Sequence, residues 1–147
     1  MLQTRIQDEV KTAMRAKDKA RLGTLRLITA AIKQREVDER ITLDDEQVLV
    51  VLDKMQKQRR ESISQYKEAG RDELVEQEEF ELGIIQTFLP TPLTDDEVTA
   101  LITDAISSTG ASGMRDMGKV MGILKPQIQG RADGGKVSQL VKAKLAD

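Results

Sequence analysis

The sequence has no cysteine and no histidine among its 147 residues. Without cysteine the chain can form no disulfide, no zinc–thiolate site and no thiol nucleophile. Without histidine it lacks the commonest general base and the commonest metal ligand. Most enzyme templates are therefore excluded, and we expect no catalytic residue, no metal site and no cofactor.

Aromatic residues and long apolar runs are also scarce. Tyr66, Phe80 and Phe88 are the only aromatic residues, so a domain that stacks single-stranded bases on aromatic platforms is not expected. No stretch of about 18 apolar residues could span a bilayer, and the first residues lack the apolar core of a signal peptide. These absences predict a cytoplasmic protein with no membrane partner, whose nucleic-acid contacts, if any, go through backbone and shape.

Apolar residues recur instead at the spacing of amphipathic helices. In the first helix, Leu2, Ile6, Val10 and Met14 are four residues apart. Proline, glycine and N-capping residues punctuate the pattern. We expect helices over residues 2–17, from Asp18 to about 36, from a capping signal at Thr42 to 69, and over 72–89, 94–110, 116–124 and 133–145.

The segment from Leu89 to Leu93 contains Pro90 and Pro92 and cannot continue a helix. No alternating strand pattern is found. The sequence therefore predicts an all-α protein, with an N-terminal subdomain of about four helices over residues 1–90, a proline-containing linker, and a three-helix C-terminal subdomain over 94–147.

Gly70 separates two of the expected helices, and a hairpin there would pair residues whose numbers sum to about 141. That register brings Arg59 close to Glu78 and Glu81 on the facing helix. We interpret these three residues as a structural ion pair.

Four motifs imitate functional sites without meeting their requirements. The segments 113–120 and 130–137 have the glycine and lysine spacing of a phosphate-binding loop, but valine replaces the metal-binding hydroxyl and no strand precedes them. The serine- and glycine-rich run 107–113 resembles an amidase signature in a chain far too short for that fold. The acidic cluster 76–81 lacks the histidines of helical di-metal sites. The methionines at 114, 117 and 121 are interpreted mainly as core filler.

Positive and negative charges are distributed unevenly along the chain. Residues 1–70 hold 15 Lys/Arg against 12 Asp/Glu, residues 71–109 hold 1 against 10, and residues 110–147 hold 7 against 3. A basic end beside an acidic middle is typical of a polyanion-binding tail, although a merely solvated surface has the same composition. The C-terminal basic residues are candidate tRNA contacts: Arg115, Lys119, Lys125, Arg131, Lys136, Lys142 and Lys144. The glycines among them and two expected helix N-termini would favour phosphate contact.

Several of these segments resemble one family throughout the chain. Residues 59–63 with Tyr66, residues 69–71 with Leu74, and 88–90 are similar to the YqeY (GatB/YqeY) family of small bacterial proteins. The same holds for residues 116–121, 130–134 and the closing Leu140, Val141 and Leu145.

The resemblance implies a two-part all-α fold that matches the tail domain of the B subunit of tRNA-dependent amidotransferases. In those enzymes a separate catalytic body acts on the misacylated tRNA, while the tail helps to hold the tRNA. We therefore expect a non-catalytic module that binds tRNA or a tRNA-processing complex. Two alternatives stay open: an adaptor that docks a basic partner on its acidic segment 71–109, and an accessory of an amidotransferase, a carbon–nitrogen ligase with glutamine as amido-N-donor.

Overall fold

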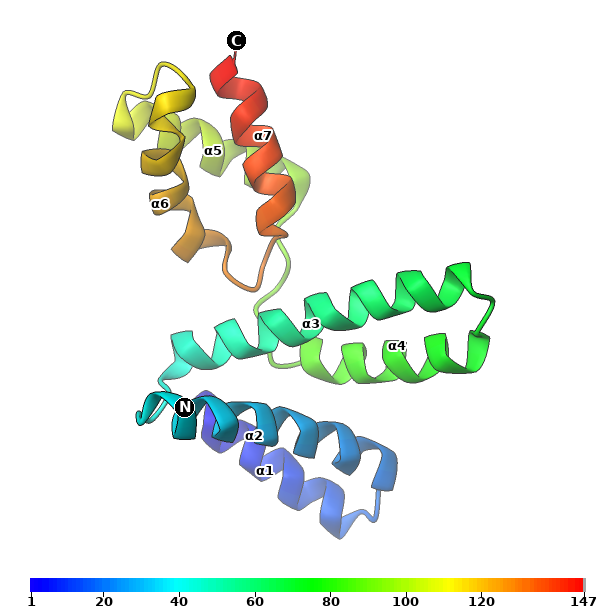
Figure 1. Ribbon diagram of the computed structural model, residues 1–147. Coiled ribbons are helices and arrows are strands. Elements are labelled where there is room, and N and C mark those ends of the chain that lie inside the picture. The colour runs from blue at the N-terminus through cyan, green and yellow to red at the C-terminus, as the bar shows by residue number, and fades with distance from the viewer. Residues whose placement is uncertain (147) are drawn as a thin grey trace. The chain divides into compact units, whose positions relative to one another are not determined.

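The computed structural model describes residues 1–146, and these form an all-α fold with no strand, as expected (Figure 1). The elements are α1 (Leu2–Arg15), α2 (Lys19–Glu39), α3 (Asp45–Glu68), α4 (Asp72–Gln86), α5 (Asp95–Thr109), the short 3₁₀ helix η1 (Met114–Asp116), α6 (Met117–Ile128) and α7 (Gly134–Ala146). The chain divides into two compact units, Met1–Pro90 and the residues from Thr91 onward.

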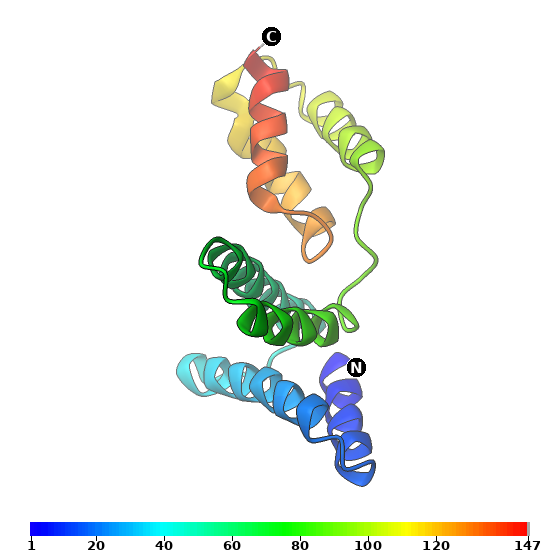
Figure 2. The ribbon, with the colours of Figure 1, turned by 90° about the vertical axis from the view of Figure 1, so that its right-hand side faces the viewer.

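The first unit consists of two helical hairpins. Figures 1 and 2 show α3 and α4 side by side and antiparallel, and Figure 2 shows α1 and α2 diverging from the turn that joins them. Ile6, Ile28 and Leu52 come from different helices and lie in one core, with Ile85 and Phe88 from the end of α4 and its following turn. These side chains are almost fully buried, so the unit has a hydrophobic core of its own.

The second unit packs α5, α6 and α7 around a separate core. Val120, Leu124 and Ile128 of α6 follow one another at a spacing of four and face Val137 and Val141 of α7 within this cluster. Thr94 caps α5, because its hydroxyl accepts from the Glu97 N–H at 3.2 Å while a Glu97 carboxylate oxygen accepts from the Thr94 N–H at 3.1 Å. The predicted limits of this helix, Thr94 at its start and Gly110 at its end, are confirmed, and Gly110 has the left-handed conformation.

The start and length of α3 differ from expectation. Thr42 is not its cap; Asp44 is, and it shares a reciprocal capping box with Gln47. An aspartate one residue before the helix provides a carboxylate acceptor for the N3 amide, which is a better cap than a more distant threonine. The helix therefore has 24 residues where the sequence pattern predicted about 27.

Helix α6 continues through Pro126, where we expected it to end at Leu124. A proline in the last turn removes one hydrogen bond, and its ring approaches the carbonyl of the residue four positions earlier. That residue is Gly122, whose backbone is readily adjusted, and continuing the helix buries Ile128 in line with Leu124. Smaller differences are that α1 ends at Arg15, α2 extends to Glu39, and α4 ends at Gln86.

None of the helices among residues 1–146 has the length and apolar character needed to cross a membrane.

Candidate nucleic-acid interface

The seven C-terminal cations lie on η1, on α6, on α7 and in the loop between α6 and α7. Arg115 is on η1, Lys119 and Lys125 are on α6, Arg131 is in the loop, and Lys136, Lys142 and Lys144 are on α7. Six are exposed, and Arg131 is half-buried. The unit therefore presents most of these charges to solvent, where a phosphate backbone could reach them.

The helices spread these charges around the unit. Lys136 and Lys144 are eight residues apart on α7 and flank the same side of its buried stripe, whereas Lys142 lies on the other side of that stripe. Lys119 and Lys125 likewise lie on opposite sides of the buried line of α6. The structure therefore brings the seven together as a basic unit and not as one continuous basic face.

Two of the seven cations donate hydrogen bonds that link separate parts of the unit. The Arg131 Nε donates to the Thr91 carbonyl at 2.9 Å, while the Arg131 carbonyl accepts from the Leu93 N–H at 2.8 Å. This residue therefore holds residues 91–93 against the loop before α7. The Lys144 Nζ donates to the Thr103 hydroxyl at 3.0 Å and links α7 to α5.

An aspartate stands at the start of both α6 and α7, the two helix N-termini that the sequence suggested for phosphate contact. Asp133 Oδ1 accepts from the Gly135 N–H at 3.0 Å, so a carboxylate occupies the start of α7. Asp116, at the start of α6, accepts from the Ser112 N–H at 3.1 Å and lies 3.8 Å from the Lys119 ammonium. A carboxylate at each helix start disfavours a second anion there, so the long cationic side chains are the better candidates for phosphate contact.

The segments that imitate phosphate-binding loops have no such geometry. Gly118 lies within the first turn of α6, and Gly134 is the first residue of α7. A phosphate-binding loop needs a strand before it and a run of inward-pointing amides. The first segment is mostly helical, and the second begins with a turn at residues 130–133 that follows α6 and leads into α7. No group of three or more acidic side chains suited to a metal is found among residues 1–146, including the cluster 76–81.

The acidic segment 71–109 is divided between the two compact units, with its first part in one and its second part in the other. In α4 several carboxylates also have cationic partners. Arg59 Nε lies 3.3 Å from a Glu81 oxygen and 3.8 Å from a Glu78 oxygen, and Lys67 lies 3.8 Å from Glu79. The Arg59 side chain is 16% exposed, so this group is a partly buried ion-pair cluster between α3 and α4.

Burial and the neighbouring Glu81 charge raise the pKa of Glu78, and Arg59 opposes that rise. Glu81, at the shorter distance, is therefore the principal partner of Arg59. The arrangement ties α3 to α4 and exposes no reactive group.

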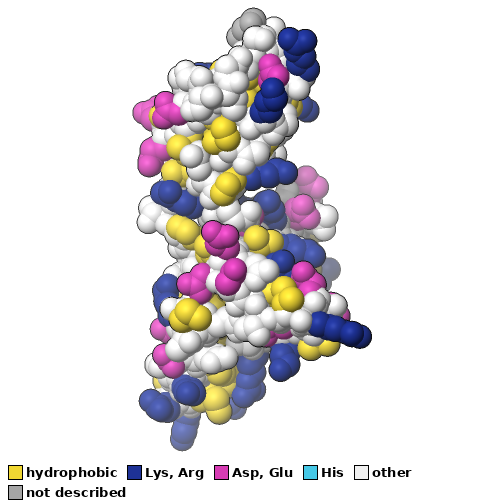
Figure 3. Space-filling model, turned by 90° about the vertical axis from the view of Figure 1, so that its left-hand side faces the viewer, with side chains coloured by type: hydrophobic (Ala, Val, Ile, Leu, Met, Phe, Trp, Pro, Cys, Tyr) yellow, Lys and Arg dark blue, Asp and Glu magenta, His cyan; other side chains and the backbone are white. Residues whose placement is uncertain are grey.

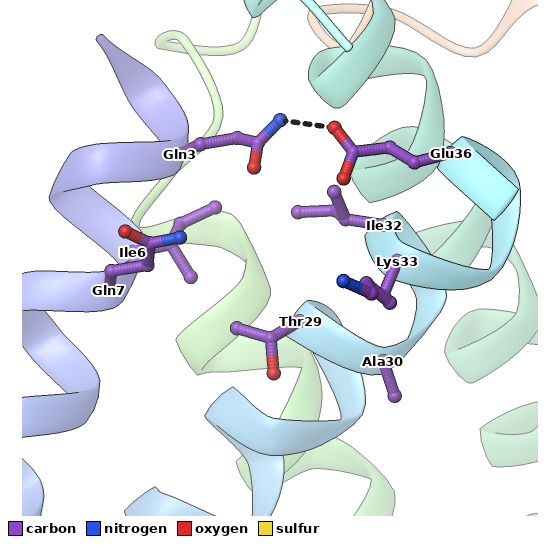
Figure 4. Close-up of a pocket in the computed structure, with 8 residues that line it drawn as sticks. All are labelled: Gln3, Ile6, Gln7, Thr29, Ala30, Ile32, Lys33 and Glu36. Atoms are coloured by element: carbon purple, nitrogen blue, oxygen red, sulfur yellow. Dashed lines mark hydrogen bonds between the residues drawn. The ribbon is translucent and has the colours of Figure 1, made fainter. Parts of the chain in front are cut away.

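Two clefts in the structure each have in their walls a carboxylate that is already hydrogen-bonded. One, of about 410 Å³, lies between α1 and α2 in the first unit (Figure 4). There a Glu36 carboxylate oxygen accepts from Gln3 Nε2 at 3.0 Å and from the Leu43 N–H at 2.9 Å. These hydrogen bonds, the Leu43 amide first, lower the pKa of Glu36.

The other cleft, of about 450 Å³, lies in the second unit and includes Glu97 and Arg131 in its walls. The Thr94 backbone amide, then the Thr94 hydroxyl, and to a smaller extent Arg131 lower the pKa of Glu97. With one carboxylate and one guanidinium, this cleft has no excess of either charge. Neither cleft contains a nucleophile paired with a base, so neither has the arrangement of an active site.

Comparison with known proteins identifies one family. The family model described as Yqey-like protein matches residues 3–145. A protein of Pyrenophora tritici-repentis named "Altered inheritance of mitochondria protein 41, mitochondrial" is 32% identical over 94% of this chain and 77% of its own length. Proteins of the same name from Eremothecium gossypii and Vanderwaltozyma polyspora are 36% and 34% identical, over 68% and 76% of this chain.

The chain spans 56% and 64% of the length of the Eremothecium and Vanderwaltozyma proteins. These relatives are fungal proteins whose names place them in mitochondria. The comparison therefore contradicts the cytoplasmic location and the bacterial origin that we expected from the sequence. Absence of an apolar leader was not sufficient ground for a cytoplasmic location.

Proposed function

Since the chain belongs to the family of Yqey-like proteins, we propose that it is a non-catalytic helical module that binds tRNA through its C-terminal unit. One observation carries this proposal. Residues 110–147 hold 7 Lys/Arg against 3 Asp/Glu, and six of the seven cations are exposed. A small unit with this excess attracts a polyanion over its whole surface.

The seven cations divide into those that are available to a ligand and those that already link parts of the unit. Arg115, Lys125, Lys136 and Lys142 are exposed and form no ion pair among the described residues, and Lys119 is only loosely paired with Asp116 at 3.8 Å. These five are the proposed phosphate contacts. Arg131 and Lys144 are placed in the same unit but act first as links within it.

The expected mode of binding is recognition of a folded backbone. Unit two contains no aromatic residue, so bases cannot be stacked on it, and cations spread over several sides suit a curved phosphate surface better than a straight strand. The similarity to the tail of amidotransferase B subunits supports the choice of tRNA among folded RNAs. Neither cleft has a nucleophile paired with a base, and this supports a module that binds tRNA without catalysing a reaction on it.

The proposal predicts that replacing Lys119, Lys136 and Lys142 by glutamate weakens tRNA binding strongly. Each lost phosphate contact should lower the slope of log affinity against log salt by about 0.9, and three reversed charges should reduce affinity at low salt by roughly tenfold or more. Binding is measured by fluorescence anisotropy with labelled tRNA over a salt series. Far-ultraviolet circular dichroism checks that the helices remain.

The matched control replaces Lys33, Lys54 and Arg60 of the first unit by glutamate. These residues are equally exposed, so the control changes net charge by the same amount. Equal losses in both variants would indicate unspecific attraction, and no binding of tRNA by the unchanged protein would contradict the proposal. Nuclease-resistant capture of one basic protein would support the adaptor alternative instead, and capture of an amidotransferase would support the accessory role.

A further inference from the structure

The turn between α1 and α2 carries the densest cluster of cations in the first unit. We call residues 11–21 the hairpin tip; it contains Lys11, Arg15, Lys17, Lys19 and Arg21 against the single acid Asp18. Figure 3 shows Lys and Arg side chains gathered at the lower end of the visible face, the end at which this turn lies in Figure 1.

Most of this charge is not neutralised within the unit. Arg21 pairs with Glu9 at 3.0 Å, and Asp18 uses a carboxylate oxygen to cap α2 through the Arg21 N–H at 3.1 Å. The other four cations are exposed and have no ion pair in the described part of the chain. With Arg21 paired to Glu9, the four remaining cations and the single carboxylate of Asp18 leave a net charge of +3 at the tip.

The backbone of the tip holds a lysine where glycine would be easier to accommodate. Lys17 has a φ of 57°, in the left-handed region, and the turn is closed by the Lys17 N–H to Met14 and the Asp18 N–H to Ala13. A side chain at such a position costs conformational energy that glycine avoids. This left-handed residue follows the end of α1, so Lys17 lies at the turn itself.

The placement of the other cations is locally unfavourable too. Lys19 and Arg21 lie in the first turn of α2, at the positive end of the helix dipole, where the N-cap Asp18 supplies the only carboxylate. Lys11 and Arg15 are four residues apart on α1, so their like charges face one another. An anion bound at the tip would reduce both repulsions, the one with the helix dipole and the one between Lys11 and Arg15. Anion binding at the tip is therefore electrostatically favourable.

The surroundings indicate which polyanion fits. Met14, 53% exposed, is the only large apolar side chain exposed at the tip. The other exposed apolar residues of the tip are the alanines Ala16 and Ala20. A membrane anchor needs more apolar area than this, and the tip has no aromatic residue to stack on unpaired bases. The remaining match is the phosphate backbone of a folded RNA.

We propose that the hairpin tip is a second, independent phosphate-backbone contact for the tRNA that the C-terminal unit binds, with Arg15, Lys17 and Lys19 as its principal cations. This inference rests on the proposed function. It adds that the first unit is itself part of the RNA interface.

The test neutralises the tip in the full chain through Arg15→Gln, Lys17→Asn and Lys19→Gln. Asparagine tolerates the left-handed conformation better than most residues, and the like-charge conflicts disappear, so the melting temperature should stay the same or rise. We expect tRNA affinity at low salt to fall at least tenfold and the salt slope to fall by about two to three. The matched control is Lys33→Gln, Lys54→Gln and Arg60→Gln, which should leave the salt slope near that of the unchanged protein.

The outcomes separate this inference from the proposed function. If the unchanged protein binds tRNA and the tip variant has the same affinity and salt slope, the tip inference is wrong while the proposed function stands. If the tip variant loses affinity and the glutamate variant of Lys119, Lys136 and Lys142 does not, the tip is supported and the C-terminal site is overturned. Tip-dependent binding to vesicles of phosphatidylserine and phosphatidylcholine, without tRNA binding, would overturn both.

Discussion

Glu36 shows how one side chain can fix the loop that precedes α3. Its carboxylate accepts from the Leu43 amide and from Gln3, and it thereby joins the end of α2, the following loop and the start of α1 (Figure 4). These hydrogen bonds favour the charged form, so the pKa of Glu36 lies below its ordinary value near 4.5. The Glu36 carboxyl therefore contributes to the stability of the folded state only while it is ionised.

The pH dependence follows from that sign. The stabilisation is fully present above the unfolded pKa and is lost as the pH falls through the folded pKa. We expect Glu36→Gln to lower the melting temperature at pH 7 and the difference from the unchanged protein to shrink as the pH falls below about 4.5. Thermal unfolding at pH 7, 5, 4 and 3 measures this. A difference that stayed constant down to pH 3 would show that the charge of Glu36 has no role.

At the scale of elements, the α3–α4 hairpin depends on which carboxylate pairs with Arg59. Glu81 is 13% exposed and lies nearer than Glu78, whose pKa is raised by burial and by Glu81. We expect Glu81→Gln to lower the free energy of unfolding by about 1–2 kcal/mol, because Arg59 then loses its principal partner in a partly buried position. Glu78→Gln removes a carboxylate whose charge is disfavoured, so it should be neutral or slightly stabilising.

Urea denaturation of the two variants at pH 7 tests this ranking, with Arg59→Met as a third variant that removes the cation itself. Each glutamine substitution removes one charge with little change of shape, so each serves as the control for the other. Equal destabilisation by Glu78→Gln and Glu81→Gln would mean that Arg59 divides its charge evenly between them.

The elements that the sequence predicted well are those fixed by local chemistry. The capping box of Thr94 and Glu97 and the left-handed Gly110 lie within a few residues of the ends that they define, so their pattern was readable. The end of α6 was not, because burial of Ile128 in the tertiary core outweighs the local effect of Pro126. A core contact of this kind is invisible to a rule about one residue and its neighbours.

The sequence predicted which part of the chain is basic, but it did not predict which of the cations are free to contact a ligand. Counting cations located the basic C-terminal unit, but nothing in the sequence indicated that Arg131 binds the Thr91 carbonyl or that Lys144 binds Thr103. Residues 40 or more positions apart form these links, and only the packed helices bring them together. The hairpin tip could have been found from sequence, since a charge count over residues 11–21 already shows five cations against one acid.

For the whole molecule, the decisive property is that each compact unit has its own hydrophobic core. The cluster around Leu52 and Ile85 and the cluster around Leu124 and Val141 share no residue. A unit with a complete core is expected to fold without the other. If the proposed RNA contacts are divided between the two units, each unit by itself should retain partial affinity.

We therefore expect a fragment of residues 1–90 to keep its helical circular dichroism signal and to unfold cooperatively on heating. The fragment from residue 91 onward should also be helical but less stable, because a chain of about 60 residues buries a smaller fraction of its surface. Circular dichroism melts of both fragments beside the full chain provide the measurement. A fragment 1–90 that lost its cooperative transition would show that its core depends on residues beyond Pro90, and the two units would then have to be treated as one folding domain.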